Sequence, residues 1–107
     1  VNATGGTLAL RSCRIVSNRR AGVALSAKAE VELERCEIET NGTHGITLLG
    51  SSRARISGSK VTANRKEGVS VDDGSTVSAT ESDLRGNQGG SWSVSPGCHV
   101  DSRGNLD

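Results

Sequence analysis

The chain has 107 residues, enough for one domain, and its hydrophobic residues make up 33% of the sequence, below the usual share for a globular domain. Trp92 is the sole aromatic residue, so a compact globule would lack the large side chains that normally fill its centre. The net charge of +1 points to neither a nucleic-acid nor a membrane partner, and no apolar run approaches a transmembrane length.

The chain begins at Val1 rather than at Met, so we expect a fragment or a processed form of a longer protein. It contains three cysteines, and an odd number argues poorly for a disulfide framework. No signal peptide is visible. We therefore favour a cytoplasmic, intracellular assembly over secretion.

A repeat of 23 residues starts near residue 8 and runs for three steps without insertion or deletion. Self-similarity at a fixed period indicates stacked structural units. We expect coils at about 8–30, 31–53, 54–76 and 77–99, followed by a tail or cap at 100–107. The asparagines of the repeat are Asn18, Asn41, Asn64 and Asn87, and one apolar column is Val23, Ile46, Val69 and Trp92.

Within each unit the apolar residues alternate with polar ones, as in Val31-Glu-Leu33 and Ile46-Thr-Leu48. This period of two predicts short strands with one buried face, joined by turns that contain Gly, Asn and Ser. Leucine-rich and hexapeptide periodicities are absent. The sequence therefore predicts an all-β, right-handed parallel β-helix, or solenoid, of about four coils with three short strands per coil.

The asparagine column predicts a ladder at an inward turn, where each side chain bonds the coils above and below. Such bonds satisfy turn amides that would otherwise cost about 1–3 kcal/mol each when buried. The glycines at Gly22, Gly45 and Gly68 are expected to adopt a positive φ before the third strand.

A second structural column consists of Cys13, Cys36, Ser59 and Ser82. Stacked Cα atoms about 4.8 Å apart would permit a disulfide. Side chains of parallel, in-register strands point the same way, however, so we expect two free thiols that fill small spaces in the core. Neither cysteine has the neighbours that a zinc site needs.

The outward column Arg14, Glu37, Lys60 and Asp83 alternates in sign, which favours the correct register of the coils. Four further basic residues fall on one turn, two coils apart. These residues, Arg19, Arg20, Arg65 and Lys66, together with Trp92 are candidates for partner binding, although a solvated loop edge is the simpler explanation for the turn.

The pattern C/N-x-I-x-x-N-x-x-x-G-[IV]-x-[LV] resembles the parallel β-helix repeat family over about residues 5–99. That family is also described as the fold of carbohydrate-binding proteins and sugar hydrolases. The run Asn41-Gly-Thr-His-Gly45-Ile-Thr-Leu looks most like the uninterrupted repeats of the β-helix region of F-box proteins. The resemblance implies the fold, and the fold hosts many functions.

The motifs of sugar-cleaving relatives are incomplete. Asp72-Asp73-Gly74 and Thr43-His44-Gly45 faintly resemble polygalacturonase motifs, but their order is reversed and the Asn-Thr-Asp and Arg-Ile-Lys motifs are missing. The two aspartates are better explained by an Asp-Gly turn at a strand end. His44 and His99 fall in different columns. We therefore expect no enzyme, no metal and no cofactor.

These observations favour a non-catalytic scaffold or protein–protein interaction module within a larger protein or assembly. Open ends of a β-helix expose strand edges, so we expect protein partners, neighbouring coils or end-to-end self-association there. The alternative is a glycan-binding or polysaccharide lyase or hydrolase fragment of the same fold.

Overall fold

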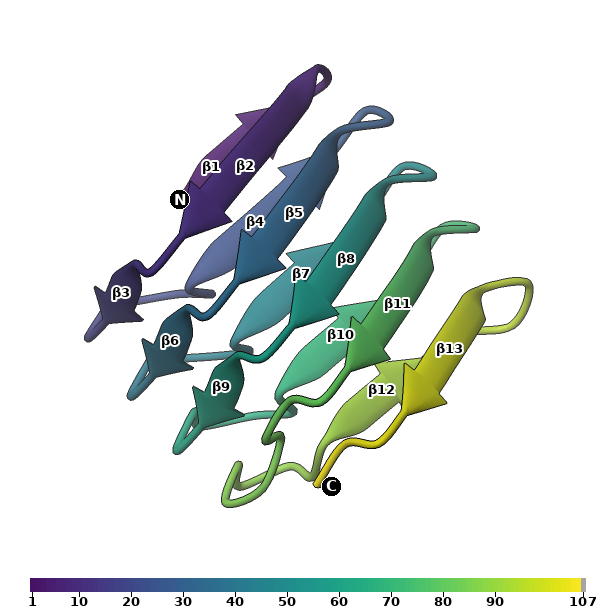
Figure 1. The fold of residues 1–107 in the computed structure, drawn as a ribbon. Coiled ribbons are helices and arrows are strands. Elements are labelled where there is room, and N and C mark those ends of the chain that lie inside the picture. Colours follow the sequence, from purple (N-terminus) through teal and green to yellow (C-terminus); the bar gives the residue numbers. More distant parts are fainter. Residues whose placement is uncertain (107) are drawn as a thin grey trace.

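A computed structural model describes residues 1–106, which form thirteen strands in three parallel sheets and contain no helix (Figure 1). Sheet A consists of β1 (Asn2–Thr4), β4 (Val23–Ser26), β7 (Ile46–Leu48), β10 (Val69–Val71) and β12 (Trp92–Val94). Sheet B consists of β2 (Thr7–Arg11), β5 (Glu30–Glu34), β8 (Arg53–Ser57), β11 (Thr76–Thr80) and β13 (His99–Arg103). Sheet C consists of β3 (Arg14–Val16), β6 (Glu37–Glu39) and β9 (Lys60–Thr62).

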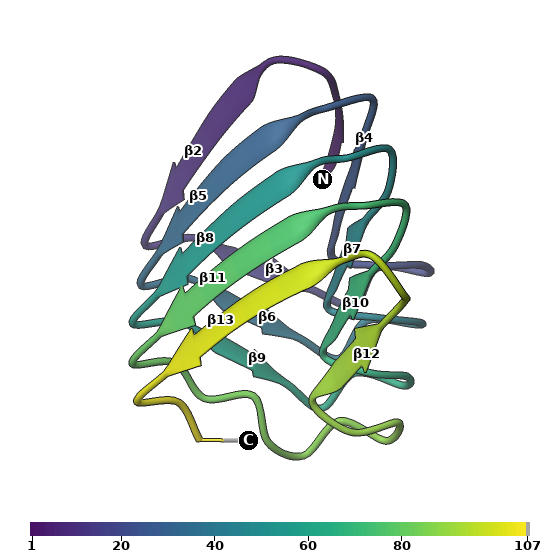
Figure 2. The same ribbon diagram turned by 90° about the vertical axis from the view of Figure 1, so that its right-hand side faces the viewer.

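The chain visits the sheets in the fixed order B, C, A, so that three faces enclose one interior (Figure 2). Neighbouring strands pair in register, with Val31 beside Ala54 and Ala54 beside Val77. This arrangement confirms the predicted all-β parallel β-helix with three strands per coil. Within the described residues, nothing forms a helix long and apolar enough to cross a membrane.

The stack extends to both ends of the described chain. At the first rung β1 pairs with β4, and at the last rung β13 pairs with β11. Leu106 forms a further parallel bridge with Asp83, so residues 99–106 begin another coil. The turn between β1 and β2 holds only Gly5 and Gly6, whereas the equivalent turn between β4 and β5 holds three residues.

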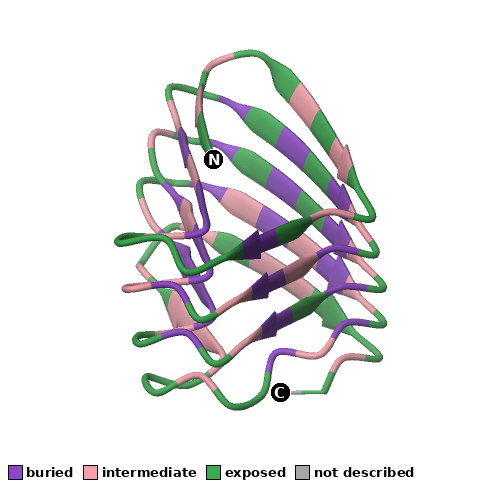
Figure 3. Ribbon diagram, turned by 90° about the vertical axis from the view of Figure 1, so that its left-hand side faces the viewer, coloured by how far each residue is buried: buried purple, intermediate pink, exposed green. Residues whose placement is uncertain are grey.

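Buried residues alternate with more exposed ones along the central strands (Figure 3), and their aliphatic side chains form one interior column. Leu33, Ile38 and Leu48 come from the three sheets and are fully buried. Burial decreases at the ends, where Leu8 and Trp92 are only partly covered and Val94 is 47% exposed. The fold therefore buries its core by stacking coils, because a single coil encloses too little apolar area.

The asparagine ladder joins the coils at the turn between sheets C and A. The side-chain amide of Asn41 donates to Oδ1 of Asn64 at 2.9 Å, and the backbone N–H of Asn41 donates to the same oxygen at 3.0 Å. Asn64 repeats both bonds to Asn87. Each interior amide also donates to a carbonyl of the preceding coil, Ile15 for Asn41 and Ile38 for Asn64.

Two further ladders support the other turns. The backbone N–H of Cys36 donates to Ser59 Oγ, and that of Ser59 donates to Ser82 Oγ. Asn105 extends this column, because its Oδ1 accepts from the N–H of Ser82 at 2.9 Å. At the turn between sheets A and B, the N–H of Ser52 donates to Ser75 Oγ at 3.1 Å.

The prediction that Gly22, Gly45 and Gly68 require a positive φ is wrong, because none of the three adopts one. Space is the reason for these glycines. A Cβ on Gly45 would lie 2.3 Å from Val61 Cγ1 and 2.8 Å from the side-chain amide of Asn64. The absent side chain thus lets the asparagine ladder approach the third strand.

Loss of an interior ladder amide is expected to destabilise the fold strongly. Asn64→Ala removes the acceptor of two donors of Asn41 and one donor to the carbonyl of Ile38, so we expect a loss of about 2–4 kcal/mol in the free energy of unfolding. Urea unfolding followed by circular dichroism measures this loss. Asn18→Ala is the matched control, because Asn18 is exposed at the end of the ladder and should cost about 1 kcal/mol or less. Equal costs for the two variants would contradict the ladder's role.

The steric role of the glycine column is tested by Gly45→Ala against Gly86→Ala. A Cβ at position 45 would also lie 2.7 Å from the backbone oxygen of Gly68, which cannot move aside as a side chain can, so overpacking should cost about 3 kcal/mol or more of unfolding free energy. Gly86 has φ of +76° and no atom within 4 Å of its hypothetical Cβ, so its substitution carries only the backbone cost of about 1–2 kcal/mol. Thermal unfolding should therefore show the lower midpoint for Gly45→Ala, and the reverse order would refute the packing explanation.

Candidate functional site

The carboxylates and histidines suspected from the sequence are distributed over separate parts of the surface. Asp72 accepts hydrogen bonds from the hydroxyls of Ser70 and Ser95. Asp73 and Gly74 both have a positive φ and form the turn before β11. His44 Nε2 lies 3.0 Å from Glu67 Oε1 on the asparagine turn, whereas His99 belongs to β13.

The cysteines of the described chain are free. The Cys36 thiol is buried and donates to the carbonyl of Leu10 at 3.2 Å, while the Cys13 thiol donates to the carbonyl of Arg11 at 3.3 Å. Within residues 1–106, no three His, Cys, Asp or Glu side chains gather closely enough to hold a metal ion.

Among residues 1–106, Arg14 and Glu37 form the one ion pair between members of the alternating charge column. Arg14 lies 3.5 Å from both Glu37 and Glu39. At the other end, Asp83 pairs with Arg85 rather than with Lys60, through Nε and Nη2 at 3.1 and 3.2 Å. These two guanidinium bonds, with a third from the backbone N–H of Arg85, hold the pKa of Asp83 below its ordinary value.

Four basic residues share the turn between sheets C and A, and we call Arg19, Arg20, Arg65 and Lys66 the basic edge. All four are exposed, and within residues 1–106 none forms an ion pair. They occupy two adjacent columns of the first and third coils. The intervening coil contributes Gly42 and Thr43, so no charged side chain separates the upper and lower cations.

A hollow of about 540 Å³ lies along the basic edge, with Arg19 and Arg65 in its wall. Gly42 also lines the hollow and packs so tightly that a Cβ there would lie 2.1 Å from the carbonyl oxygen of Arg19. Gln88 completes the wall in the next coil, and the residues that line the hollow include no carboxylate. Arg20 lines a neighbouring hollow with Thr43 and Thr47.

Trp92, the fifth residue proposed for partner binding, is not part of the basic edge. It occupies the interior column below Val69 and packs against the hydrophobic core in the last rung of sheet A. The structure therefore separates the sequence-derived candidates into a basic edge and a core residue at the end of the stack.

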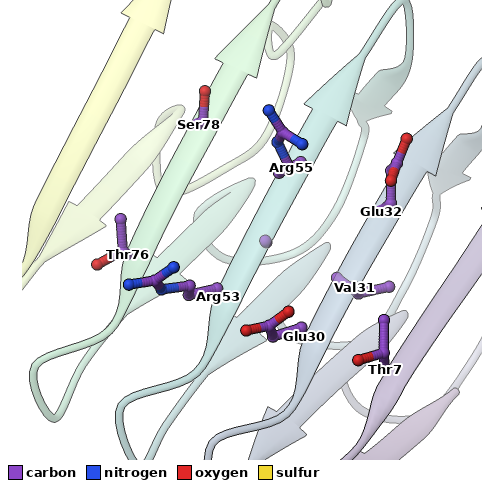
Figure 4. Close-up of a pocket in the computed structure, with 9 residues that line it drawn as sticks. Thr7, Glu30, Val31, Glu32, Arg53, Arg55, Thr76 and Ser78 are labelled. Atoms are coloured by element: carbon purple, nitrogen blue, oxygen red, sulfur yellow. The ribbon is translucent and has the colours of Figure 1, made fainter.

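A second surface, on the outer face of sheet B, carries charged residues that the sequence analysis did not select (Figure 4). Glu30 and Glu32 project from β5, and their register partners Arg53 and Arg55 project from β8. They flank a groove of about 400 Å³ whose lining also includes Val31 of β5 and Ala54 of β8. The signal was present in the sequence, since each glutamate precedes an arginine by one repeat.

The pairing of Asp83 with Arg85 predicts a specific titration. Arg85→Ala should raise the pKa of Asp83 toward its ordinary range, because the substitution removes the guanidinium bonds that favour the ionised carboxylate. Because the folded-state pKa is lowered, Asp83 stabilises the fold fully above about pH 4 and loses this contribution as pH falls through the folded pKa. Carboxyl ¹³C NMR measures the shift, with Arg103→Ala as a control that should leave Asp83 unchanged. An unaltered Asp83 titration in Arg85→Ala would contradict this assignment.

Comparison with known proteins adds the handedness and the family. A family model described as a right-handed beta helix region matches residues 1–106, nearly the whole chain. No curated protein and no solved structure matches the chain. Together with the three parallel sheets, the family match leads to one conclusion: the chain belongs to the right-handed β-helix family.

Proposed function

We propose that this chain is a non-catalytic interaction module whose basic edge binds an acidic segment of a partner protein. The observation that carries the proposal is the placement of four exposed cations on one edge, free of ion pairs within residues 1–106, two of which, Arg19 and Arg65, line a hollow with no carboxylate in its lining. An anionic group entering between Arg19 and Arg65 meets two guanidiniums and no repelling charge.

The spacing of the cations indicates the form of the partner. The first and third coils are two strand spacings apart, about 9.6 Å. An extended segment in the polyproline II conformation has three residues per turn and rises about 3.1 Å per residue, so side chains at i and i+3 project from the same side about 9.3 Å apart. The best fit is therefore an extended segment that runs along the solenoid axis with acidic residues at positions i and i+3.

The asparagine ladder holds the backbone of this surface in place in the unbound protein. Asn18 and Asn41 flank the hollow and are bonded to each other, and the N–H of Arg65 donates to the carbonyl of Asn41 at 3.1 Å. A backbone already held in this way loses little conformational entropy on binding. Exposed ion pairs contribute only about 0.2–1 kcal/mol each, so we expect weak, salt-sensitive binding.

The scaffold part of the proposal concerns the two end rungs. β1, β2 and β3 at one end, and β12 and β13 at the other, have strand edges without a neighbour among residues 1–106. Such edges pair readily with further strands. We propose that neighbouring coils cover them in the assembly, which leaves the basic edge as the lateral binding surface.

The proposal is tested with a fluorescein-labelled peptide of sequence Glu-Ser-Thr-Glu-Ser-Thr-Glu. Fluorescence anisotropy should detect binding to the wild-type protein at low ionic strength, and binding should weaken as salt is added. The double substitution Arg19→Glu with Arg65→Glu should raise Kd at least about tenfold, because it replaces attraction with repulsion at both contacts. Arg53→Glu with Arg55→Glu, an equal charge change on sheet B, is the matched control and should leave Kd unchanged.

Two results would overturn the proposal. One is equal peptide binding by the wild-type protein and the Arg19→Glu/Arg65→Glu variant. The other is preferential binding or depolymerisation of an oligogalacturonate by the wild-type protein, which would establish the alternative of a glycan-binding or polysaccharide-cleaving fragment.

A further inference from the structure

We infer that the outer face of sheet B binds a second copy of this chain, face to face, through the complementary charges of β5 and β8. This inference concerns a different surface from the basic edge and does not depend on it. The central observation is that one strand carries a row of carboxylates and the adjacent strand carries a row of guanidiniums, in register (Figure 4).

The groove crosses both strands, and each of its sides carries one in-register pair of opposite charges. Glu30 and Arg53 stand on one side, and Glu32 and Arg55 stand on the other. All four residues are exposed, and within residues 1–106 they form no ion pair with each other or with another group. The guanidinium of Arg53 extends toward Thr76, away from Glu30 (Figure 4).

This pattern is self-complementary under a two-fold rotation. If the axis lies parallel to the strands and midway between β5 and β8, the rotation places β5 of one copy over β8 of the other and keeps the position along the strand. Glu30 then faces Arg53 of the second copy, and Glu32 faces Arg55. Each copy supplies both rows, so the contact is made twice and closes as a dimer.

The flanking strands are compatible with the same axis. β2 of one copy lies over β11 of the other, so Thr7 faces Thr76 and Ala9 faces Ser78 without charge repulsion. Arg11 is already paired with Glu34 of its own chain at 3.2 Å. β13, with its own Arg103–Asp101 pair, falls outside the overlap. The net charge of +1 adds little long-range repulsion between copies.

The size of the face sets the strength of the association. Four strands of five residues cover about 300 Å² per copy, well below the roughly 800 Å² per partner of a standard stable interface. The contact is also polar. We therefore expect a transient dimer that forms at high protein concentration and low ionic strength, and that dissociates as salt screens the charges.

Sedimentation velocity on the folded 107-residue chain tests the inference. The wild-type protein should show a concentration-dependent dimer at low salt. Variant N, with Glu30→Arg and Glu32→Arg, and variant C, with Arg53→Glu and Arg55→Glu, should each be monomeric, because both rows of each variant then carry one sign. The dimer dissociation constant should rise at least about tenfold.

Mixing variants N and C is the decisive experiment. An equimolar mixture of variants N and C should form a one-to-one heterodimer, since each positive row then faces a negative row. The fourfold variant that combines all these substitutions should dimerise again by itself, which also controls for misfolding of variants N and C. Circular dichroism verifies the fold, and Glu30→Gln with Glu32→Gln provides a milder test if variant N does not fold.

Several outcomes would overturn the inference. They are a wild-type monomer at all concentrations, a dimer that variants N and C leave intact, or folded variants that do not associate when mixed. Larger oligomers that are insensitive to these substitutions would indicate end-to-end stacking, and a charged peptide bound in the groove of a monomer would indicate a different occupant. Arg19→Glu with Arg65→Glu should leave the dimer intact, so this test and that of the basic edge fail independently.

Discussion

The constraint on which the structure depends is the need to satisfy the backbone at an inward turn of each coil. One asparagine per coil does so in both directions: its Oδ1 accepts from the preceding coil, and its amide donates to the following one. An asparagine can serve two coils only if it recurs at a fixed distance, so a residue inserted or deleted between Asn41 and Asn64 would misalign the bonds that join these two asparagines. The constant repeat is therefore a hydrogen-bonding requirement as well as a packing one.

The ladder also determines which positions remain free for function. Inward columns are filled by aliphatic residues and by the asparagine and serine ladders, and Gly22, Gly45 and Gly68 leave no room for a side chain because the asparagine amide lies close to where a Cβ would be. The outward columns are free of these packing and hydrogen-bonding constraints. Each contains a stack of side chains about 4.8 Å apart, so a coil-by-coil choice of charge produces an ordered surface. The basic edge and the charged face of sheet B are two such surfaces, turned toward different sides of the same rigid column.

The sequence predicted the architecture because the repeat supplies it directly: period-two alternation defines the strands, and the constant step defines their partners. It did not predict the reason for Gly45, since a steric contact with Asn64 and a positive φ both call for glycine. Asn105 was missed because it replaces serine by a longer side chain in the same role. Asp83 pairs with Arg85 rather than with Lys60 because of how the side chains of Asp83 and Arg85, two residues apart in one segment, are oriented. A sequence pattern does not give this orientation. The groove on sheet B could have been found, because its acidic and basic residues are one repeat apart.

The most direct test of the ladder is the hydrogen exchange of side-chain amides. This exchange is normally fast because side-chain amides are solvated. NMR of the ¹⁵N-labelled protein resolves the Nδ2 protons of Asn41 and Asn64, whose amides are buried and doubly bonded, and the Nε2 protons of exposed Gln88 on the same turn. If the ladder holds the coils together, the two asparagine amides should exchange only when the stack opens, at rates close to those of the most protected backbone amides. Exchange of Asn41 and Asn64 as fast as that of Gln88 would contradict the account.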